Sequence, residues 1–166
     1  MNDTQADPDF TRLFELIKDI RIAMLTTFTA GGETHTRPMF TQNPEYSEPG
    51  VLWFLTDLKS AKVSEILNYP KVLATYSDRA SNNYVVVSGT GDVVRDPERV
   101  RKVWSIHAKA WFPDGPDDPS IGLLRVRPTK GEYWDGPNKA SYMLSLLKAV
   151  VTGTQPDGGA HRTVRV

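Results

Sequence analysis

Short apolar segments separated by polar turns predict that this chain is built mainly from β-strands. The segments are rich in the β-branched and aromatic residues that are typical of strands. We expect six or seven strands, at residues 22–29, 35–42, 51–55, 71–77, 84–95, 121–126 and 132–134. Pro38 interrupts the second segment and donates no ladder hydrogen bond. It therefore indicates a sheet edge, a bulge or a place where a ligand replaces the neighbouring strand.

Apolar residues at helical spacing predict helices at residues 10–20, 97–110 and 138–150, with a shorter helix after Ser60. These helices do not alternate regularly with the strands, which argues against a doubly wound parallel sheet. A glycine pair at residues 89 and 91 lies within the fifth strand, where glycines bend strands at barrel corners. The pattern therefore predicts a mainly β (α+β) fold, an antiparallel barrel of six or seven strands with flanking helices.

The length and composition narrow the possible functions. A chain of 166 residues is long enough for one core, and we expect a single domain over residues 1–151. Residues 152–166 are rich in Gly, Pro, Thr and Arg and are expected to form a disordered tail. Twenty basic and twenty acidic residues cancel, so the charge gives no sign of a nucleic-acid or membrane surface.

Several kinds of chemistry are excluded or disfavoured by residue content. There is no cysteine, which excludes disulfides, thiolate catalysis and thiolate metal sites. The histidines at positions 35, 107 and 161 share no metal-binding spacing, so we expect no metal. The N-terminus is polar and acidic, and the apolar stretch at residues 142–151 is too short to cross a bilayer. We therefore expect a cytoplasmic protein.

The stretch from Val51 to Lys62 carries the clearest sign of a binding site. It begins as a buried strand, breaks at Thr56-Asp57 and leads through Ser60 into a helix. A hydroxyl, an ammonium group and free backbone N–H groups would meet at that helix start, where the helix dipole favours an anion. We interpret it as the phosphate end of a cofactor site. The alternative is an ordinary helix cap beside a solvated lysine.

Arg37 is the only arginine in the second predicted strand. It has two interpretations, a surface residue on an edge strand or a second cation over the same anion site as Ser60 and Lys62. The second interpretation follows from the expected pairing of the two strands, which are close in the sequence.

Five segments together point to a known family. They are Thr36-Arg37-Pro38-Met39, Leu52-Trp53-Phe54-Leu55-Thr56-Asp57 with Ser60 and Lys62, Tyr84-Val85-Val86-Val87-Ser88-Gly89, residues 109–119 with Trp111-Phe112, and Glu132-Tyr133-Trp134-Asp135. In this order they resemble the flavin-binding split-barrel proteins related to pyridoxamine 5′-phosphate oxidase, most closely their general stress protein branch. The resemblance extends over residues 10–136, and its most specific part is the tryptophan-phenylalanine loop.

The resemblance implies an FMN-binding split barrel that forms a homodimer with the flavin at the interface. FMN matches better than FAD or a deazaflavin. The resemblance assigns the flavin phosphate to Arg37, Ser60 and Lys62. The remaining cofactor residues that it implies, along the ring or covering it, are Pro38, Met39, Gln42, Leu55, Thr56, Trp111, Phe112 and Trp134, with Trp111 and Phe112 coming from the partner chain.

Three departures from the oxidase argue against pyridoxamine phosphate oxidation. Ala61 stands where the oxidase has a second arginine at the phosphate helix, and Gln42 stands where it has a lysine near the ring. The segment at residues 136–142 lacks the arginine and histidine that grip the pyridoxal substrate in the oxidase. We therefore do not expect that activity.

Two functions stay open at this point, and no residue stands out as catalytic. One is an FMN-dependent oxidoreductase of unknown substrate, with reduced nicotinamide or another small molecule as electron donor. The other is a stress protein that binds or buffers flavin without turnover. A barrel that binds nucleic acid is a third class, and the neutral charge argues against it.

Overall fold

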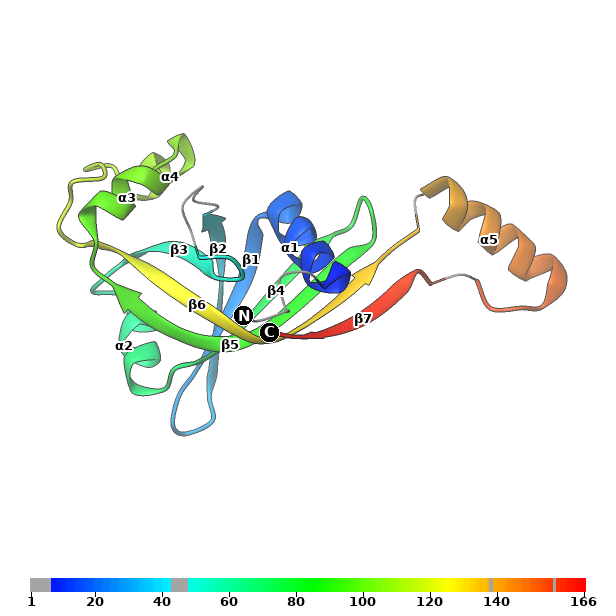
Figure 1. Cartoon of the computed structure of the whole chain (residues 1–166), viewed down its shortest axis with the longest axis horizontal. Helices are drawn as coiled ribbons and strands as arrows, with labels where there is room; N and C mark the ends of the chain where they lie inside the picture. Colours follow the sequence, from blue (N-terminus) through cyan, green and yellow to red (C-terminus); the bar gives the residue numbers. More distant parts are fainter. Residues whose placement is uncertain (1–6, 43–47, 138, 157) are drawn as a thin grey trace.

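Seven antiparallel strands form one sheet that closes on itself as a barrel (Figure 1). The computed structural model describes residues 7–42, 48–137, 139–156 and 158–166. The strands are β1 (Ile22–Phe28), β2 (Thr34–Gln42), β3 (Leu52–Asp57), β4 (Lys71–Asp78), β5 (Asn83–Val94), β6 (Ile121–Asp135) and β7 (Ala160–Arg165). Their order is β3-β2-β1-β4-β5-β6-β7, and pairing of β3 with β6 closes a six-stranded barrel. The expected mainly β barrel with flanking helices is confirmed.

Five helices accompany the described strands: α1 (Pro8–Ile20), α2 (Ala61–Asn68), α3 (Pro97–Val103), α4 (Ile106–Trp111) and α5 (Lys139–Thr152). α1 starts at Asp7, whose carboxylate accepts a hydrogen bond from the Asp9 N–H and so satisfies one of the free donors of the first turn. Its apolar face packs into the barrel core. α3 and α4 cover a second apolar cluster around Trp53, which lies under the guanidinium of Arg99 at 4.5 Å from the ring centroid.

The glycine kink of β5 is confirmed. The register between β5 and β6 shifts between Ser88 and Gly89, which marks a bulge. A Cβ atom at Gly89 would lie 2.3 Å from the Arg127 carbonyl oxygen, so only glycine lets the two backbones come this close. The neighbouring Pro128 is tolerated because it lies opposite this irregular position.

Two boundaries differ from the sequence-based expectation. The segments 121–126 and 132–134 are parts of one long strand, β6, because the bulged β5 keeps pairing with it along its whole length. The single helix expected over residues 97–110 is interrupted at Trp104. Ser105 then caps a new helix, its side chain accepting a hydrogen bond from the Ala108 N–H.

The expectation of a disordered tail is wrong for residues 160–165. They form β7, which pairs with residues 130–135 of β6. β6 extends past its partner β3 here and offers an open edge to the returning chain. Val164 lies in the core cluster and is 2% exposed, so one buried side chain anchors a segment that is otherwise polar.

Among the described residues, no helix has the length and apolar content that crossing a lipid bilayer requires.

Candidate anion and cofactor site

The barrel is split between β2 and β3. These strands pair only at Thr41 with Phe54 and Gln42 with Trp53, after which β3 continues along β6. β1 borders the other edge of β2 over residues 34–40, so the edge that faces the split has no strand partner in the described sheet over this length. Pro38 lies on this open edge, which confirms the edge interpretation. Backbone donors and acceptors at such an edge are free for a ligand.

α2 begins at the end of β3, beside the split. Ser60 occupies the N-cap position, yet its side chain does not cap the helix. Its hydroxyl donates to the Asp57 carbonyl at 2.6 Å, accepts from the Lys62 ammonium at 3.0 Å and lies 3.4 Å from the Thr56 hydroxyl. Ser60 therefore does not act as an ordinary helix cap. The Val63 N–H donates to the Ser60 carbonyl oxygen at 3.0 Å, and no side chain of the described residues caps the first turn. The remaining N–H groups there could bind an anion.

Lys62 is held out of bulk water. Burial lowers its pKa, the charge of Arg37 lowers it further, and the carboxylates of Asp57 and Glu65 act in the opposite direction with smaller effect. The two carboxylates thus offset only part of the cost of this half-buried ammonium group beside a second cation. A bound anion would add to that counter-charge.

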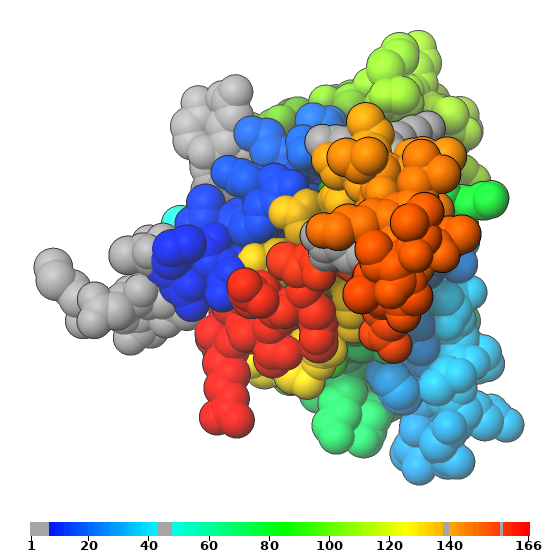
Figure 2. All heavy atoms as spheres, turned by 90° about the vertical axis from the view of Figure 1, so that its right-hand side faces the viewer, coloured from blue at the N-terminus to red at the C-terminus, as the bar shows by residue number. Residues whose placement is uncertain are grey.

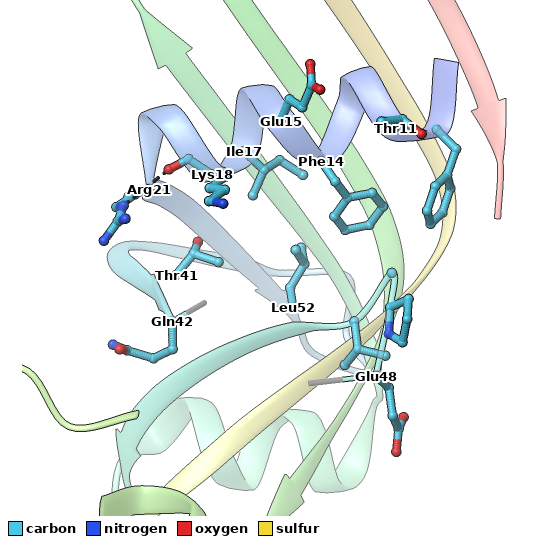
Figure 3. A pocket seen from close by; sticks show the side chains of 14 residues that line it. Thr11, Phe14, Glu15, Ile17, Lys18, Arg21, Thr41, Gln42, Glu48 and Leu52 are labelled. Atoms are coloured by element: carbon cyan, nitrogen blue, oxygen red, sulfur yellow. Dashed lines mark hydrogen bonds between the residues drawn. The ribbon is translucent and has the colours of Figure 1, made fainter. Parts of the chain in front are cut away.

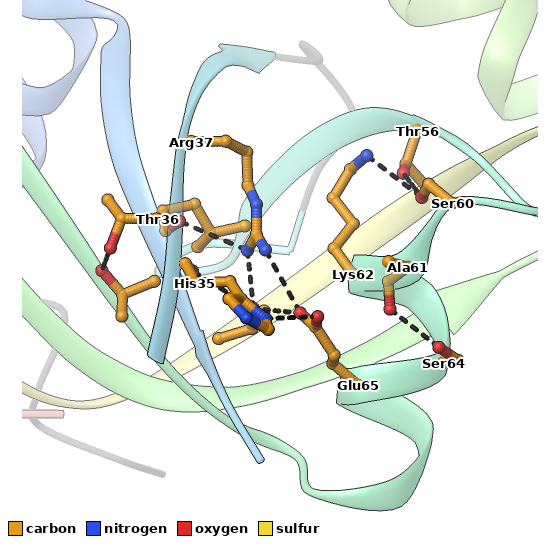
Figure 4. Close-up of polar contacts among 12 residues, drawn as sticks. His35, Thr36, Arg37, Thr56, Ser60, Ala61, Lys62, Ser64 and Glu65 are labelled. Carbon is orange, nitrogen blue, oxygen red and sulfur yellow. Dashed lines mark hydrogen bonds and ion pairs between the residues drawn. The ribbon is translucent and has the colours of Figure 1, made fainter. Parts of the chain in front are cut away.

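Arg37 reaches the same region from β2 (Figure 4). One of its terminal nitrogens donates to the Thr27 hydroxyl at 2.6 Å, and the other donates to a Glu65 carboxylate oxygen at 3.2 Å. Its side chain is 23% exposed. Figure 4 shows Arg37 and Lys62 side by side between β2 and α2, in agreement with the effect of Arg37 on the pKa of Lys62. The structure thus brings together the arginine, serine and lysine expected at a phosphate.

Glu65 is the functional residue that the sequence did not reveal. Besides Arg37, its carboxylate accepts a hydrogen bond from the Thr27 hydroxyl at 2.5 Å and lies 2.7 Å from His35 Nδ1. Burial raises the pKa of Glu65, but the hydrogen bonds from Thr27 and His35 and the charge of Arg37 together bring it below the ordinary value. Two signals were present in the sequence: Glu65 lies one helical turn after Lys62, and His35 shares a strand face with Arg37.

The other expected ring residues follow the split away from the cations. Thr56 is 1% exposed with its hydroxyl beside that of Ser60, whereas Leu55 is buried in the apolar cluster around Trp53. Met39 and Gln42 lie further along β2, and Gln42 is buried with its amide donating to the Phe40 carbonyl at 3.4 Å. The strand rise places Gln42 roughly 17 Å from Arg37, a span that suits an extended mononucleotide-sized ligand.

A cavity of about 440 Å³ opens near Gln42, between α1 and the ends of β2 and β3 (Figure 3). Its apolar wall includes Phe10, Phe14 and Leu52. Lys18 and Arg21 add two cations, and Figure 3 shows Arg21 at the same end as Gln42. Glu15 and Glu48 also line it, so its charged groups balance. A small molecule with an aromatic or apolar body and polar groups would match this lining.

The three expected aromatic covers lie apart from the cation cluster within one chain. Trp111 ends α4 and is 79% exposed, whereas Phe112 is half-buried against Trp104, with ring centroids 6.3 Å apart. Trp134 stacks on His161 at 4.6 Å. Thr56, beside the cation cluster, pairs with Gly122 of β6. Trp134 lies roughly 40 Å further along the same extended strand. Trp134 therefore does not reach the cation cluster from its own chain. α4, which Trp111 ends, contacts β2 of the same chain, where His107 stacks on Phe40 at 5.5 Å.

The chemistry of the cluster suits a phosphate monoester. Two cations and two hydroxyls lie beside the uncapped helix start, and the carboxylates of Asp57 and Glu65 offset part of the positive charge. Over the described ranges, no three His, Asp or Glu side chains gather into a metal-binding group.

Comparison with known proteins identifies the family of this chain. Residues 8–157 match the model of the family described as pyridoxamine 5′-phosphate oxidase like. Protein bli-3 of Neurospora crassa is 29% identical over 111 residues, 61% of this chain and 53% of that protein, so the chain spans about half its length. General stress protein 26 of Bacillus subtilis is 25% identical over 138 residues, 81% of this chain and 94% of that protein.

Solved structures agree with the sequence relatives. A crystal structure described as a general stress protein 26 from Jannaschia sp. CCS1 has a TM-score of 0.80 and 29% identity, covering 96% of this chain and all of that one. The general stress FMN/FAD binding protein of Xanthomonas citri has a TM-score of 0.66 and 25% identity, covering 77% of this chain and 89% of that one. The chain therefore belongs to the pyridoxamine 5′-phosphate oxidase-like family.

Proposed function

We propose that this protein binds FMN, with the flavin phosphate held by Arg37, Ser60 and Lys62. The observation that carries the proposal is the meeting of these side chains at the uncapped start of α2, beside the open edge of β2. The phosphate of FMN carries close to two negative charges at neutral pH. It would add to the counter-charge that Asp57 and Glu65 give to Lys62, and charge-assisted bonds from Arg37 and Lys62 are of the strong kind.

The flavin ring is assigned to the split beyond the phosphate. Backbone groups of Pro38 and Met39 on the open edge of β2 would contact the ring, Leu55 and Thr56 would form the wall behind it, and Gln42 would reach its far end. The Xanthomonas citri relative, which is named an FMN/FAD binding protein, supports this class of cofactor. FMN is favoured over FAD because the cluster offers one compact phosphate position.

The proposed unit is a homodimer. Trp134 lies far along β6 from its own cluster, so it would cover a flavin from a second chain. The 79% exposure of Trp111 also leaves its ring unexplained by the packing of one chain.

We infer that the protein is an oxidoreductase of unknown substrate rather than a pyridoxamine phosphate oxidase. Bound FMN would supply the capacity to accept and pass on electrons, and the protein would bind, orient and shield it. The cavity beside Gln42, with an apolar wall and charged groups of both signs, offers a place for a small donor or substrate. Ala61 and Gln42 replace two cations expected of the oxidase, which argues against its substrate.

A second function, flavin buffering without turnover, is favoured by Glu65. Its carboxylate shares Arg37 with the proposed phosphate and cancels part of the positive charge. That arrangement weakens the hold on a phosphate and suits a flavin that exchanges. Mixing the FMN-loaded protein with reduced nicotinamide in the absence of air separates the two functions. Bleaching of the flavin absorbance supports the reductase. An unchanged spectrum, together with rapid exchange of the bound FMN with free FMN, supports buffering.

The phosphate assignment is tested by comparing FMN with riboflavin, which lacks the phosphate. Lys62→Ala removes one charge-assisted contact and should weaken FMN binding by about ten- to a hundredfold while leaving riboflavin unchanged. Lys59→Ala is the matched control, because Lys59 is an exposed lysine just before the same helix. Fluorescence titration measures both ligands. Equal losses for FMN and riboflavin in the Lys62 variant would contradict the phosphate site.

A further inference from the structure

The C-terminal part of the chain forms an arm that leaves the barrel. β6 continues beyond its pairing with β3 as far as Asp135, and β7 returns along its residues 130–135. α5 lies between these two strands in the sequence and at the far end of the arm in space (Figure 1). Figure 2, which looks at that end, shows α5 in front of the rest of the molecule. The helix is thus presented to solvent and does not cover the barrel.

One side of α5 is apolar and exposed. Five of its side chains, the α5 stripe, are between 58% and 85% exposed: Met143, Leu144, Leu147, Val150 and Val151. At 3.6 residues per turn they fall within an arc of roughly 120°, the width of a helix face that normally packs against a core. Lys148 and Thr152 lie on the adjacent polar side, and Tyr142 and Leu146 on the opposite flank are half-buried.

The stripe needs a partner for a physical reason. An isolated helix of 14 residues is marginal in water, because its stability comes mostly from packing of its apolar face. α5 contains two lysines and no acidic residue, so ion pairs along the helix cannot compensate. Contiguous exposed apolar surface of this kind marks an interaction site.

The barrel carries a second exposed apolar surface. Ala23, Tyr76 and Val85 are paired across β1, β4 and β5 and point into the core. Their sequence neighbours therefore point outward. The apolar ones at this end of the sheet form the outer sheet patch, Ile22, Met24 and Tyr84, which are 56%, 43% and 40% exposed.

We propose that the α5 stripe of one chain covers the outer sheet patch of a second copy, and the reverse, in a two-fold homodimer. This adds to the homodimer of the proposed function the surfaces that form it. Reciprocal exchange satisfies both surfaces at once, as a closed two-fold contact requires. Each stripe would bury on the order of 500 Å² of apolar surface. With the areas covered on the receiving sheets, the two contacts reach on the order of 2,000 Å², which is the size of a stable interface.

The charge of α5 argues for protein rather than lipid as its occupant. Helices that lie on membranes carry several Lys or Arg residues on the polar face. The polar side of α5 presents Lys148 among hydroxyl side chains, which offers little attraction to anionic lipid.

The test measures assembly of the flavin-free full chain by analytical ultracentrifugation, from about 0.1 to 100 µM. Leu147→Glu and Met24→Glu each place a carboxylate in the proposed contact and should raise the dimer dissociation constant at least tenfold. Lys148→Glu is the control, because it introduces the same side chain on the polar side of the same helix and should leave assembly within about threefold of wild type. Circular dichroism verifies folding. If either glutamate variant fails to fold, serine is introduced at the same position instead.

Three results would overturn the proposal. They are a wild-type chain that stays monomeric across the concentration range, a Leu147 or Met24 variant that dimerises like wild type, and a monomer that floats with phosphatidylserine-containing vesicles. None of these measurements involves flavin. Failure of FMN binding and failure of this interface are therefore distinguishable.

Discussion

Arg37 and Lys62 could be assigned to one site from sequence because each breaks the pattern around it. A lone arginine in a strand that contains proline, and a lysine at a helix start after a buried strand, have few purely structural uses. Glu65 gave no such signal, since a glutamate inside a short helix is ordinary. Its role depends on Thr27 and His35, which reach it through the register of β1 and β2, and that register is a long-range property.

Glu65 should make the stability of the protein sensitive to acid. Its pKa in the folded protein lies below the ordinary value of 4.5, so its ionised form contributes stability above that pH. This contribution is lost as the pH falls through the folded-state pKa. Urea unfolding of wild type and Glu65→Gln between about pH 3 and 7 should therefore show the largest difference at neutral pH and convergence in acid. A difference that stays constant over the range would show that the charge of Glu65 does not support the fold.

Trp111 and Phe112 are adjacent in the sequence and should differ in what they contribute. Trp111 is exposed, so Trp111→Ala should leave the melting temperature of the flavin-free protein within a few degrees. Phe112 packs beside Trp104, and Phe112→Ala should cost about 2–3 kcal/mol of unfolding free energy. If Trp111 covers a flavin from the partner chain, its variant should also bind FMN more weakly and quench its fluorescence less. A Trp111 variant that melts as early as the Phe112 variant would place both in the scaffold.

At the scale of elements, the strands were predictable where apolar side chains alternate or cluster, as in β1, β4 and β5. The break between α3 and α4 was not, since Ser105 caps a new helix within a segment that keeps helical spacing. β7 was not predicted because Val164 is its only buried residue. The composition of a mostly polar segment does not reveal that one side chain will be buried in the core.

Val164 provides the test of whether β7 is a stable part of the sheet. Val164→Ala removes two methyl groups from a position that is 2% exposed, and it should lower the unfolding free energy by about 1–3 kcal/mol. Thr163→Ala is the matched control, because the neighbouring side chain is exposed and its loss should change little. Chemical denaturation measures both variants. Equal stability of the two would mean that the strand adds nothing to the fold.

At the scale of the whole molecule, the sequence predicted a homodimer from the resemblance to a family and from Trp111-Phe112, and the apolar stripe of the last helix gave no further sign of it. An apolar stripe at helical spacing in residues 138–150 is read as a helix that packs on its own core. The structure instead places that helix at the end of β6 and β7, and the side chains that should have been buried face solvent. The apolar pattern of one sequence cannot distinguish a helix face that packs on the barrel of its own chain from one that packs on the barrel of a second chain.

The two proposals together make flavin binding and assembly one coupled equilibrium. If aromatics of the partner chain complete the flavin site, the dimer binds FMN more tightly than the monomer, and FMN must tighten the dimer by the same factor. We expect the FMN dissociation constant to fall at least about tenfold as the chain concentration passes from below to above the dimer dissociation constant. Fluorescence titration at several chain concentrations measures the first effect, and sedimentation with saturating FMN measures the second. Leu147→Glu should shift the rise in FMN affinity to higher chain concentration without changing the affinity of the dimer once formed. Equal FMN affinity in the monomeric and dimeric ranges would show that one chain completes the flavin site by itself, in which case Trp111 and Trp134 would have to serve the dimer in some other way.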